Sequence, residues 1–311
     1  MKKKIITVIA ACYNESGNLE SLYNRVKSVF DALDNYDFEL LYVDNVSTDD
    51  SLMIYHSLVE QDDRVKVIIM SRNFGESQPS FLAGLHHAKG DGIVLMDGDI
   101  QDPPGVIATF IPLWEEGFDV VYGIRKRRKG SIIRRFFYFC FYRIFNWLSY
   151  LNIPLDAGDF GIMDRRVVEA IKKLPEKDVY IRGLRSWVGF RQVGVSYVRD
   201  DRQSGKTSIN FFRNFFWAKR AIVSFSYKPL EYISAFASLA VVMTIIASIF
   251  YCVRAFTTDM PRGFPTILLA LFFFSTIQML TLSILAEYIM RIFHEVKGRP
   301  AYLIDRILHK E

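Results

Sequence analysis

Four short apolar runs in the first hundred residues each end at a polar motif, and apolar residues at helical spacing follow the first three. The runs cover residues 5–12, 38–43, 65–70 and 93–96. Strands that alternate with helices predict a mostly parallel sheet with helices on both faces, so the expected fold class is α/β. Ligands of such sheets bind outside the carboxyl ends of the strands. The sequence therefore predicts one crevice at which the four polar motifs converge.

The fourth motif, Asp97-Gly98-Asp99-Ile100-Gln101-Asp102-Pro103-Pro104, places an acid-x-acid pair directly after an apolar run. Hard divalent cations prefer oxygen ligands and usually share them with substrate phosphates. An isolated pair of this kind is more often a polar turn, but three other strand ends carry polar motifs here. We therefore interpret Asp97, Asp99 and Gln101 as candidate ligands of Mg²⁺ or Mn²⁺ that also line a diphosphate.

Two long segments near the C-terminus, residues 233–253 and 264–286, contain no charged residue. Each is long enough to cross the hydrocarbon core of a bilayer, which takes roughly 20 residues. A core helix of a soluble protein would normally show a polar face, and neither segment has one. Basic residues flank the pair on both outer sides, and the positive-inside rule places those flanks in the cytoplasm.

These segments predict a three-part chain. Residues 1–228 form a cytoplasmic domain, residues 229–291 a transmembrane hairpin with spans at about 233–253 and 264–287, and residues 292–311 a cytoplasmic tail. Two aromatic and basic segments, at about 131–151 and 208–227, are typical of amphipathic helices in the headgroup region, with packing in the protein core as the alternative.

The formal net charge of +5 suits an anionic membrane surface and anionic substrates. Nucleic acid is not expected as a partner, because the basic residues cluster near apolar helices and no nucleic-acid-binding motif is present. Cys12, Cys140 and Cys252 lie far apart without metal-ligand spacing. We interpret them as reduced packing residues.

The ordered set of motifs resembles family 2 glycosyltransferases of the GT-A fold, in particular the polyprenyl-phosphate sugar synthases. The resemblance covers nearly the whole chain, including the two apolar segments. It is carried by Tyr13-Asn14-Glu15, Asp44 with Ser47 and Asp49, Ser71-Arg72-Asn73-Phe74-Gly75, Ala83-Gly84-Leu85, the acidic motif, Asp156-Ala157-Gly158-Asp159-Phe160 and Arg202-Gln203-Ser204-Gly205-Lys206.

The resemblance implies a role for each matching residue. The nucleotide-sugar would be bound by Ala11, Tyr13, Glu15, Asp44, Ser71 and Asp97, with Asp44 accepting from uracil. The metal would be held by Asp97, Asp99 and Gln101. The catalytic set would be Asp159, Asp99, Arg202 and Lys206, with Asp159 near the acceptor as the candidate base. The lipid phosphate would be bound by Arg125, Arg127 and Arg128.

Simpler interpretations of several of these residues stay open. Asp159 could be a helix cap or turn acid, and Arg202 with Lys206 could belong to a solvated or headgroup-binding loop. The basic run from Arg125 to Lys129 could be a surface run at the membrane.

The chain also departs from the pattern of the family that it resembles. Asn45-Val46 stands where that family usually has Asp-Gly, and Ala11 stands where proline is usual. Gly161 follows Asp159-Phe160 where an arginine is common. These departures leave the expected metal site intact and affect the sugar and acceptor contacts.

The resemblance implies inverting, metal-dependent transfer of a hexose from a UDP-sugar to undecaprenyl phosphate at the bacterial inner membrane. Glucose is favoured, while N-acetylglucosamine, galactose and mannose stay open. The alternatives are another acceptor, or a non-catalytic membrane scaffold or transport partner. A processive synthase is disfavoured because a Gln-x-x-Arg-Trp motif is absent from the sequence. Small residues in the first span, among them Ala235 and Ala237, would allow a homo-oligomer, for example a tetramer.

Overall fold

The computed structural model of the chain describes residues 3–125, 157–176, 179–200 and 263–310, together with single positions between 228 and 249. Contacts between residues divide the chain into two compact units. The first contains the described residues up to 200 and those from 298 onward, and the second contains residues 263–297. Each unit is described by itself below.

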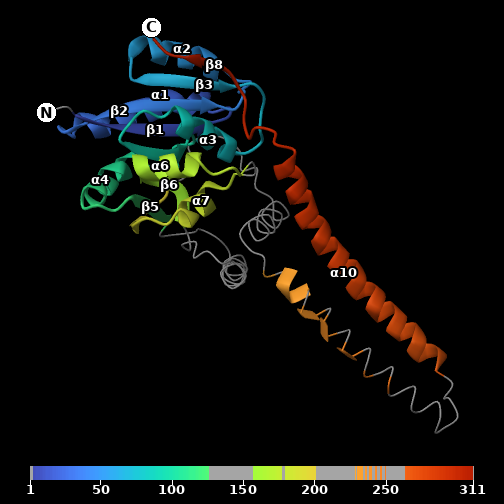
Figure 1. Ribbon diagram of the computed structural model, residues 1–311. Coiled ribbons are helices and arrows are strands. Elements are labelled where there is room, and N and C mark those ends of the chain that lie inside the picture. The colour runs from blue at the N-terminus through green and yellow to red at the C-terminus, as the bar shows by residue number, and fades with distance from the viewer. Residues whose placement is uncertain are drawn as a thin grey trace. The chain divides into compact units, whose positions relative to one another are not determined.

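The first unit is built on an eight-stranded sheet with the strand order β7-β5-β6-β4-β1-β2-β3-β8 (Figure 1). Its strands are β1 (Lys4–Cys12), β2 (Tyr36–Asp44), β3 (Val65–Met70), β4 (Gly92–Asp97), β5 (Val120–Arg125), β6 (Ala157–Asp164), β7 (Gln192–Tyr197) and β8 (Ile304–Leu308). The four strands expected from the apolar runs are confirmed as β1 to β4, and their pairings are parallel. The mostly parallel α/β sheet is therefore confirmed, although β6 runs antiparallel to both β4 and β5.

Helices follow most strands of the sheet, as the alternating pattern predicts. They are α1 (Ser16–Asp31), α2 (Ser51–Gln61), α3 (Ser77–His87), a short 3-10 turn at Pro104–Val106, α4 (Ile107–Glu115), α6 (Arg165–Lys172) and α7 (Ile181–Trp187). The two expected amphipathic segments at 131–151 and 208–227 lie outside the described residues.

Opposite faces of β1 bury against different helices, because successive side chains of a strand point to opposite sides. Val8 and Ala10 belong to a large core with apolar residues of α1, α2 and α4. Ile9 faces α3 instead, at the position of Gly84. A Cβ added to Gly84 would lie 2.4 Å from the Ile9 side chain, so only glycine allows α3 to approach the sheet this closely.

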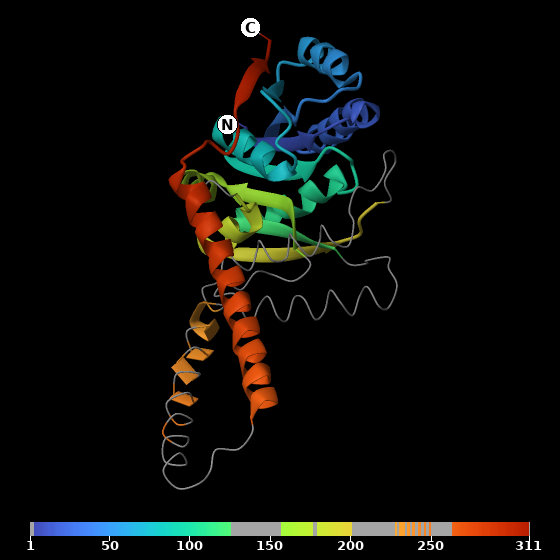
Figure 2. The same ribbon diagram turned by 90° about the vertical axis from the view of Figure 1, so that its right-hand side faces the viewer.

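The last strand, β8, comes from the C-terminal segment and adds an edge to the sheet (Figure 2). It pairs antiparallel with β3, and the backbone N–H of Ser71 donates to the carbonyl of Leu303 at 2.9 Å. The side chain of Tyr302 also contacts His86 of α3, with 2.9 Å between Oη and Nδ1. The C-terminal segment is therefore part of the sheet, which the sequence analysis did not foresee.

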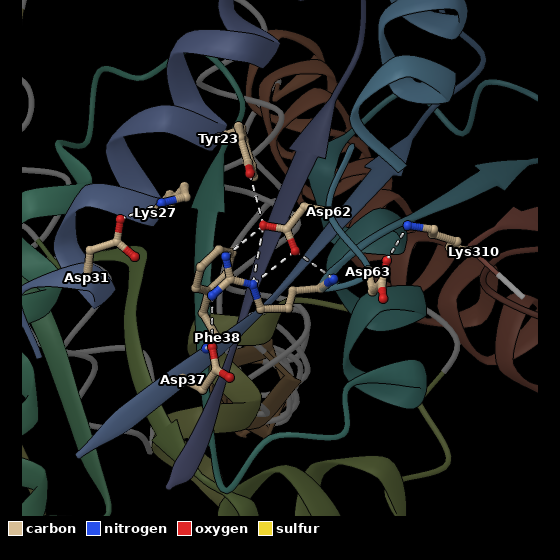
Figure 3. A network of polar contacts seen from close by, with 9 residues as sticks. Tyr23, Lys27, Asp31, Asp37, Phe38, Asp62, Asp63 and Lys310 are labelled. Atoms are coloured by element: carbon tan, nitrogen blue, oxygen red, sulfur yellow. Dashed lines mark hydrogen bonds and ion pairs between the residues drawn. The ribbon is translucent and has the colours of Figure 1, made fainter. Parts of the chain in front are cut away.

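A polar network ties the amino ends of β2 and β3 to the helices beside them (Figure 3). The Arg64 guanidinium donates to Asp62 at 2.7 Å and to Asp37 at 3.1 Å, and it lies over the Phe38 ring. Burial alone would raise the pKa of Asp62, but hydrogen bonds from Arg64 and Tyr23 lower it to about 2. These charges are paired at the end of the sheet opposite the polar motifs.

The second unit contains the helix α10 (Phe264–Val296). Its segment Ala270–Val296 is long and apolar enough to cross a membrane, and it is the one such helix within the described residues. The helix contains the second expected span and continues beyond residue 287. The first expected span, residues 233–253, falls mostly on positions that the structure does not describe, so two spans are not confirmed.

Candidate functional site

The loops after β1 and β2 are joined to each other at the carboxyl edge of the sheet. The backbone N–H of Asn14 donates to Ser47 Oγ at 2.9 Å, and Asn14 Oδ1 accepts from the backbone of Thr48 at 2.7 Å. Ala11 pairs with Asp97 across β1 and β4, and Asp44 pairs with Cys12 across β1 and β2. Residues expected to bind the nucleotide therefore lie side by side at this edge.

The side chains in these two loops differ in how accessible they are. Tyr13 is 46% exposed, whereas Asp44 is 5% exposed. The Asp44 carboxylate accepts from the backbone N–H of Ser47 at 2.9 Å and from its hydroxyl at 2.5 Å. Asp44 therefore fixes the turn that follows β2, while Tyr13 presents its ring to solvent beside it. Glu15 is half-buried and accepts from the side chain of Asn18.

Asn45 connects the loop after β2 to the loop after β3. Its Oδ1 accepts from the backbone N–H of Phe74 at 2.9 Å, and its Nδ2 donates to Asn73 Oδ1 at 3.2 Å. A carboxylate at position 45 could accept the first bond but could not donate the second. The asparagine that departs from the family pattern thus has a structural role. Ser71, at the start of the same loop, is exposed and is held through its backbone by Leu303.

The acidic motif gathers carboxylates at the end of β4. Asp99 and Asp102 are buried, and Asp97 is half-buried beside them. Burial raises the pKa of Asp97 to about 7, and the charges of Asp99, Asp102 and Asp159 add to the effect. Ionised carboxylates crowded in this way repel one another, and a cation would relieve the repulsion.

The donor set fits a hard divalent cation. Asp97 and Asp99 offer carboxylate oxygens and Gln101 an amide oxygen, which Mg²⁺ and Mn²⁺ prefer. Within the described ranges, no three His, Cys, Asp or Glu side chains are grouped closely enough to hold an ion by themselves. Mg²⁺ usually binds through one or two carboxylates plus substrate phosphates, so the two acids suit a metal that arrives with a diphosphate.

Asp102 organises the side of the site formed by β5 and β7. This carboxylate is 2% exposed and accepts from Arg125 at 3.2 Å, from Arg199 at 3.1 Å and from the Tyr197 hydroxyl. Arg125, expected to bind a lipid phosphate, therefore has its guanidinium against Asp102 and Tyr197 in this structure. Its positive charge also acts on Asp97, where it opposes the rise of the pKa.

Asp159 reaches the same edge because β6 runs antiparallel to its neighbours. Ala157, at the start of β6, pairs with Ile124 near the carboxyl end of β5. One Asp159 oxygen accepts from Gln78 of α3 at 3.2 Å, and the other forms an ion pair with Arg182 of α7 at 3.2 Å. Because Leu95 of β4 pairs with Gly161 of β6, Asp159 lies at the same end of two neighbouring strands as Asp97.

The backbone at this edge is strained. Asn14, Val46 and Ile100 have φ of 55°, 61° and 56°, in the left-handed region. Asparagine adopts this region readily, but it disfavours the β-branched Val46 and Ile100. The three residues lie in the loops after β1, β2 and β4. Strained residues tend to gather at functional sites, where the surrounding structure holds them in place.

Four expected site residues, Arg127, Arg128, Arg202 and Lys206, lie outside the described residues. Conversely, Asp102 and the residues that surround it and Asp159 were not predicted from the sequence. Asp102 could have been predicted as a site residue, because it lies inside the acidic motif directly after Gln101. The sequence offered no comparable signal for Gln78, Arg182, Arg185 and Tyr197. They belong to elements whose spatial arrangement cannot be predicted from residue periodicity.

Comparisons with known proteins identify the family of this chain. The model of the family described as "Glycosyl transferase family 2" matches residues 7–172. The uncharacterized glycosyltransferase YkcC of Bacillus subtilis (strain 168) is 38% identical over 306 residues, covering 96% of this chain and 93% of that protein. The prophage bactoprenol glucosyl transferase homolog of Escherichia coli (strain K12) is 34% identical over 308 residues, covering 97% of this chain and 99% of that protein.

A solved structure, the mannosyl-3-phosphoglycerate synthase from Rubrobacter xylanophilus, matches at a TM-score of 0.46 and 15% identity, over 71% of this chain and 73% of that one. The family model covers more than half of the chain, and relatives above 30% identity cover nearly all of it. The chain therefore belongs to glycosyl transferase family 2 and is a glycosyltransferase.

Proposed function

We propose that this glycosyltransferase moves a hexose, with glucose favoured, from a UDP-sugar to a polyprenyl phosphate such as undecaprenyl phosphate. The reaction takes place at the cytoplasmic face of the membrane and inverts the configuration at the anomeric carbon. Relatives named bactoprenol glucosyl transferase match along nearly the whole chain and support the lipid acceptor. The apolar segment of α10 supports a place at the membrane.

One observation carries the proposal: Asp97 and Asp99 lie at the same sheet edge as the joined loops after β1 and β2. A nucleotide would bind beside Tyr13 and Asp44, and its diphosphate would then lie next to the pair of carboxylates. A divalent cation on Asp97, Asp99 and Gln101 would neutralise charge that develops on the leaving UDP.

In the transfer step, an oxygen of the acceptor phosphate attacks the anomeric carbon of the hexose. The bond from that carbon to the UDP oxygen breaks on the opposite side, and UDP leaves with the bonding electrons. The phosphate nucleophile is already ionised near neutral pH, so Asp159 is needed to orient the reactants rather than to remove a proton. Arg125, together with Arg202 and Lys206, would supply positive charge near the phosphates.

The test is sugar transfer in purified membranes. Several labelled UDP-sugars are supplied with undecaprenyl phosphate and Mn²⁺, and lipid-phase label is measured for the wild type and Asp99→Asn. We expect label from one UDP-sugar and a loss of at least about 100-fold in the variant, because metal stabilisation contributes several kcal/mol.

Asp63→Asn is the matched control. Asp63 is exposed and pairs with Lys310 at the opposite end of the sheet, so transfer should be unchanged. Binding of UDP without lipid-linked product from any donor would contradict the lipid acceptor. Full activity of Asp99→Asn would contradict the metal site.

A further inference from the structure

The Asp159 carboxylate is held on both oxygens by residues from two different helices. Its Oδ2 accepts from Gln78 Nε2 of α3 at 3.2 Å, and its Oδ1 lies 3.2 Å from Arg182 Nε of α7. Asp159 itself is on β6, so three elements meet at this one group. A carboxylate held at both ends has little freedom to rotate.

The orientation of Gln78 is fixed by a second contact. Its Oε1 accepts from the backbone N–H of Ile181, the first residue of α7, at 2.8 Å. Because that N–H can only donate, the amide oxygen of Gln78 must face it and the NH₂ group must face Asp159. Gln78 is 2% exposed, so no other orientation gives both ends of the amide a partner.

A second arginine lies behind this group. Arg185 is 2% exposed and is the largest fully buried side chain in the described part of the chain. Its guanidinium lies over the Tyr122 ring, and Nη2 donates to the Gly158 carbonyl at 3.4 Å. Burial lowers the pKa of Arg185 to about 10, while the nearby Asp159 charge acts in the opposite direction.

Burying a guanidinium without a close carboxylate partner is costly, so Arg185 is not explained by stability alone. Within the described residues, Arg185 Nε has no hydrogen bond, and Asp159 Oδ1 has its ion pair with Arg182 but no hydrogen bond. Buried polar atoms are nearly always satisfied, and exceptions are found where a ligand or a catalytic role supplies the partner. Both atoms belong to the same group of side chains.

We propose that Asp159 Oδ1 recognises a hydroxyl group of the donor hexose, and that Gln78, Arg182 and Arg185 are the positioning residues that aim it. A carboxylate accepts hydrogen bonds, and sugar hydroxyls can donate them, whereas an ionised acceptor phosphate has no hydrogen to donate. Leu95 of β4 pairs with Gly161 of β6, so Asp159 lies at the same end of these two neighbouring strands as Asp97, beside the expected diphosphate site and therefore near the attached sugar. The proposal rests on the proposed function, because it assigns the sugar contact of that same reaction.

The test compares kcat/KM of the full chain for UDP-glucose with that for UDP-deoxyglucoses, each lacking one hydroxyl. If another sugar is the donor, its deoxy series is used. Sites built to bind a hydroxyl reject the analogue that lacks it strongly, so we expect the wild type to lose at least about 100-fold with one analogue. Asp159→Asn should reduce that discrimination, and Gln78→Glu should reduce it for the same analogue, since an ionised glutamate cannot donate to Asp159.

Two arginine variants separate positioning from folding. Arg182→Lys keeps the charge and should retain part of the discrimination, whereas Arg182→Met should lose it. Arg166→Gln is the control, because Arg166 is exposed and forms its ion pairs at the other end of β6. Thermal unfolding of every variant identifies any that have lost the fold.

The possible outcomes are distinct. No product from the wild type with any UDP-sugar would refute the proposed function itself. The hydroxyl assignment would be overturned if the wild type is active but the variants lower kcat/KM equally for every UDP-sugar analogue. It would also be overturned if the variants leave kcat/KM unchanged for all of them. A rise in KM for undecaprenyl phosphate with unchanged discrimination would overturn it too, because the cluster would then serve the acceptor.

Discussion

Val46 adopts a φ of 61° although it is β-branched, and it does so where the resembled family usually has glycine. The conformation is imposed by the turn that Asp44 and Ser47 form after β2. At the scale of single residues, therefore, the carboxyl edge of the sheet is held in place against local strain. Asp97 is destabilised electrostatically, because burial and the neighbouring carboxylates both disfavour its ionised form.

Replacing Val46 with glycine should stabilise the fold. A left-handed β-branched residue costs about 1–3 kcal/mol, and glycine loses roughly 0.5–1 kcal/mol through its greater freedom in the unfolded chain. We expect a net gain of about 1 kcal/mol, measured as a higher midpoint of thermal unfolding in detergent. Val43→Gly, within the buried strand β2, should lower the midpoint. A lower midpoint for Val46→Gly would show that the valine side chain contributes more than the strain costs.

Stabilisation by Mn²⁺ should depend on pH through Asp97. Its pKa is raised to about 7, above the unfolded value near 3.9, so the metal-free fold loses stability as the pH rises between these values. Above pH 7 the group is ionised and ready to bind a cation. We expect Mn²⁺ to raise the midpoint of thermal unfolding more at pH about 8 than at about 5.5. Asp97→Asn should remove the difference, and an equal effect at both values would contradict Asp97 as a ligand.

At the scale of elements, β8 does two things for the sheet. It covers the edge of β3, which would otherwise present unpaired backbone groups, and it holds the backbone of Ser71 at the start of the loop after β3. Leu308 packs against the main core, whereas Ile307 on the opposite side of the strand is 39% exposed. The two residues therefore test separate faces of one strand.

Leu308→Asp should destabilise the first unit more than Ile307→Asp does. Burying an unpaired carboxylate against the core costs several kcal/mol, so we expect a loss of about 2–3 kcal/mol for Leu308 and less than about 1 kcal/mol for Ile307. Denaturant unfolding followed by circular dichroism measures both. Equal effects of the two substitutions would mean that β8 does not pack on the core as the structure has it.

At the scale of the whole molecule, the sheet constrains how the chain can cross a membrane. β8 and β3 belong to one sheet, so residues 3–125 and 298–310 must lie on the same side of any bilayer. If α10 crosses the membrane, the chain must cross an odd number of further times between residues 200 and 263. The uncharged segment 233–253 is the candidate for that crossing.

A topology experiment tests this argument. Tags at the N-terminus and C-terminus should be reached only from the cytoplasmic side, and a tag inserted among residues 255–261 only from the outside. The positive flanks and the shared sheet both require the two ends to agree. Tags at the two ends that report opposite sides would contradict the pairing of β8 with β3 within one chain.

Local patterns along the chain were enough to predict the parallel core of the fold and the acidic motif at its edge. Apolar runs with the period of buried strands, each followed by a helix, leave few other ways to bury their side chains, so β1 to β4 were predicted within a residue or two. Asp97 and Asp99 could be chosen because they directly follow such a run. These are local signals, and short stretches of chain carry them completely.

The residues that surround those acids come from distant parts of the chain and are known only from the packing of the folded protein. Gln78 and Arg182 meet Asp159 because α3, β6 and α7 pack together, and Asp102 meets Tyr197 because β7 joins β5. β8 could not be predicted as the partner of β3, since its pairing joins segments more than two hundred residues apart. Such contacts depend on the order in which strands are placed in the sheet, and residue periodicity along the chain does not encode that order.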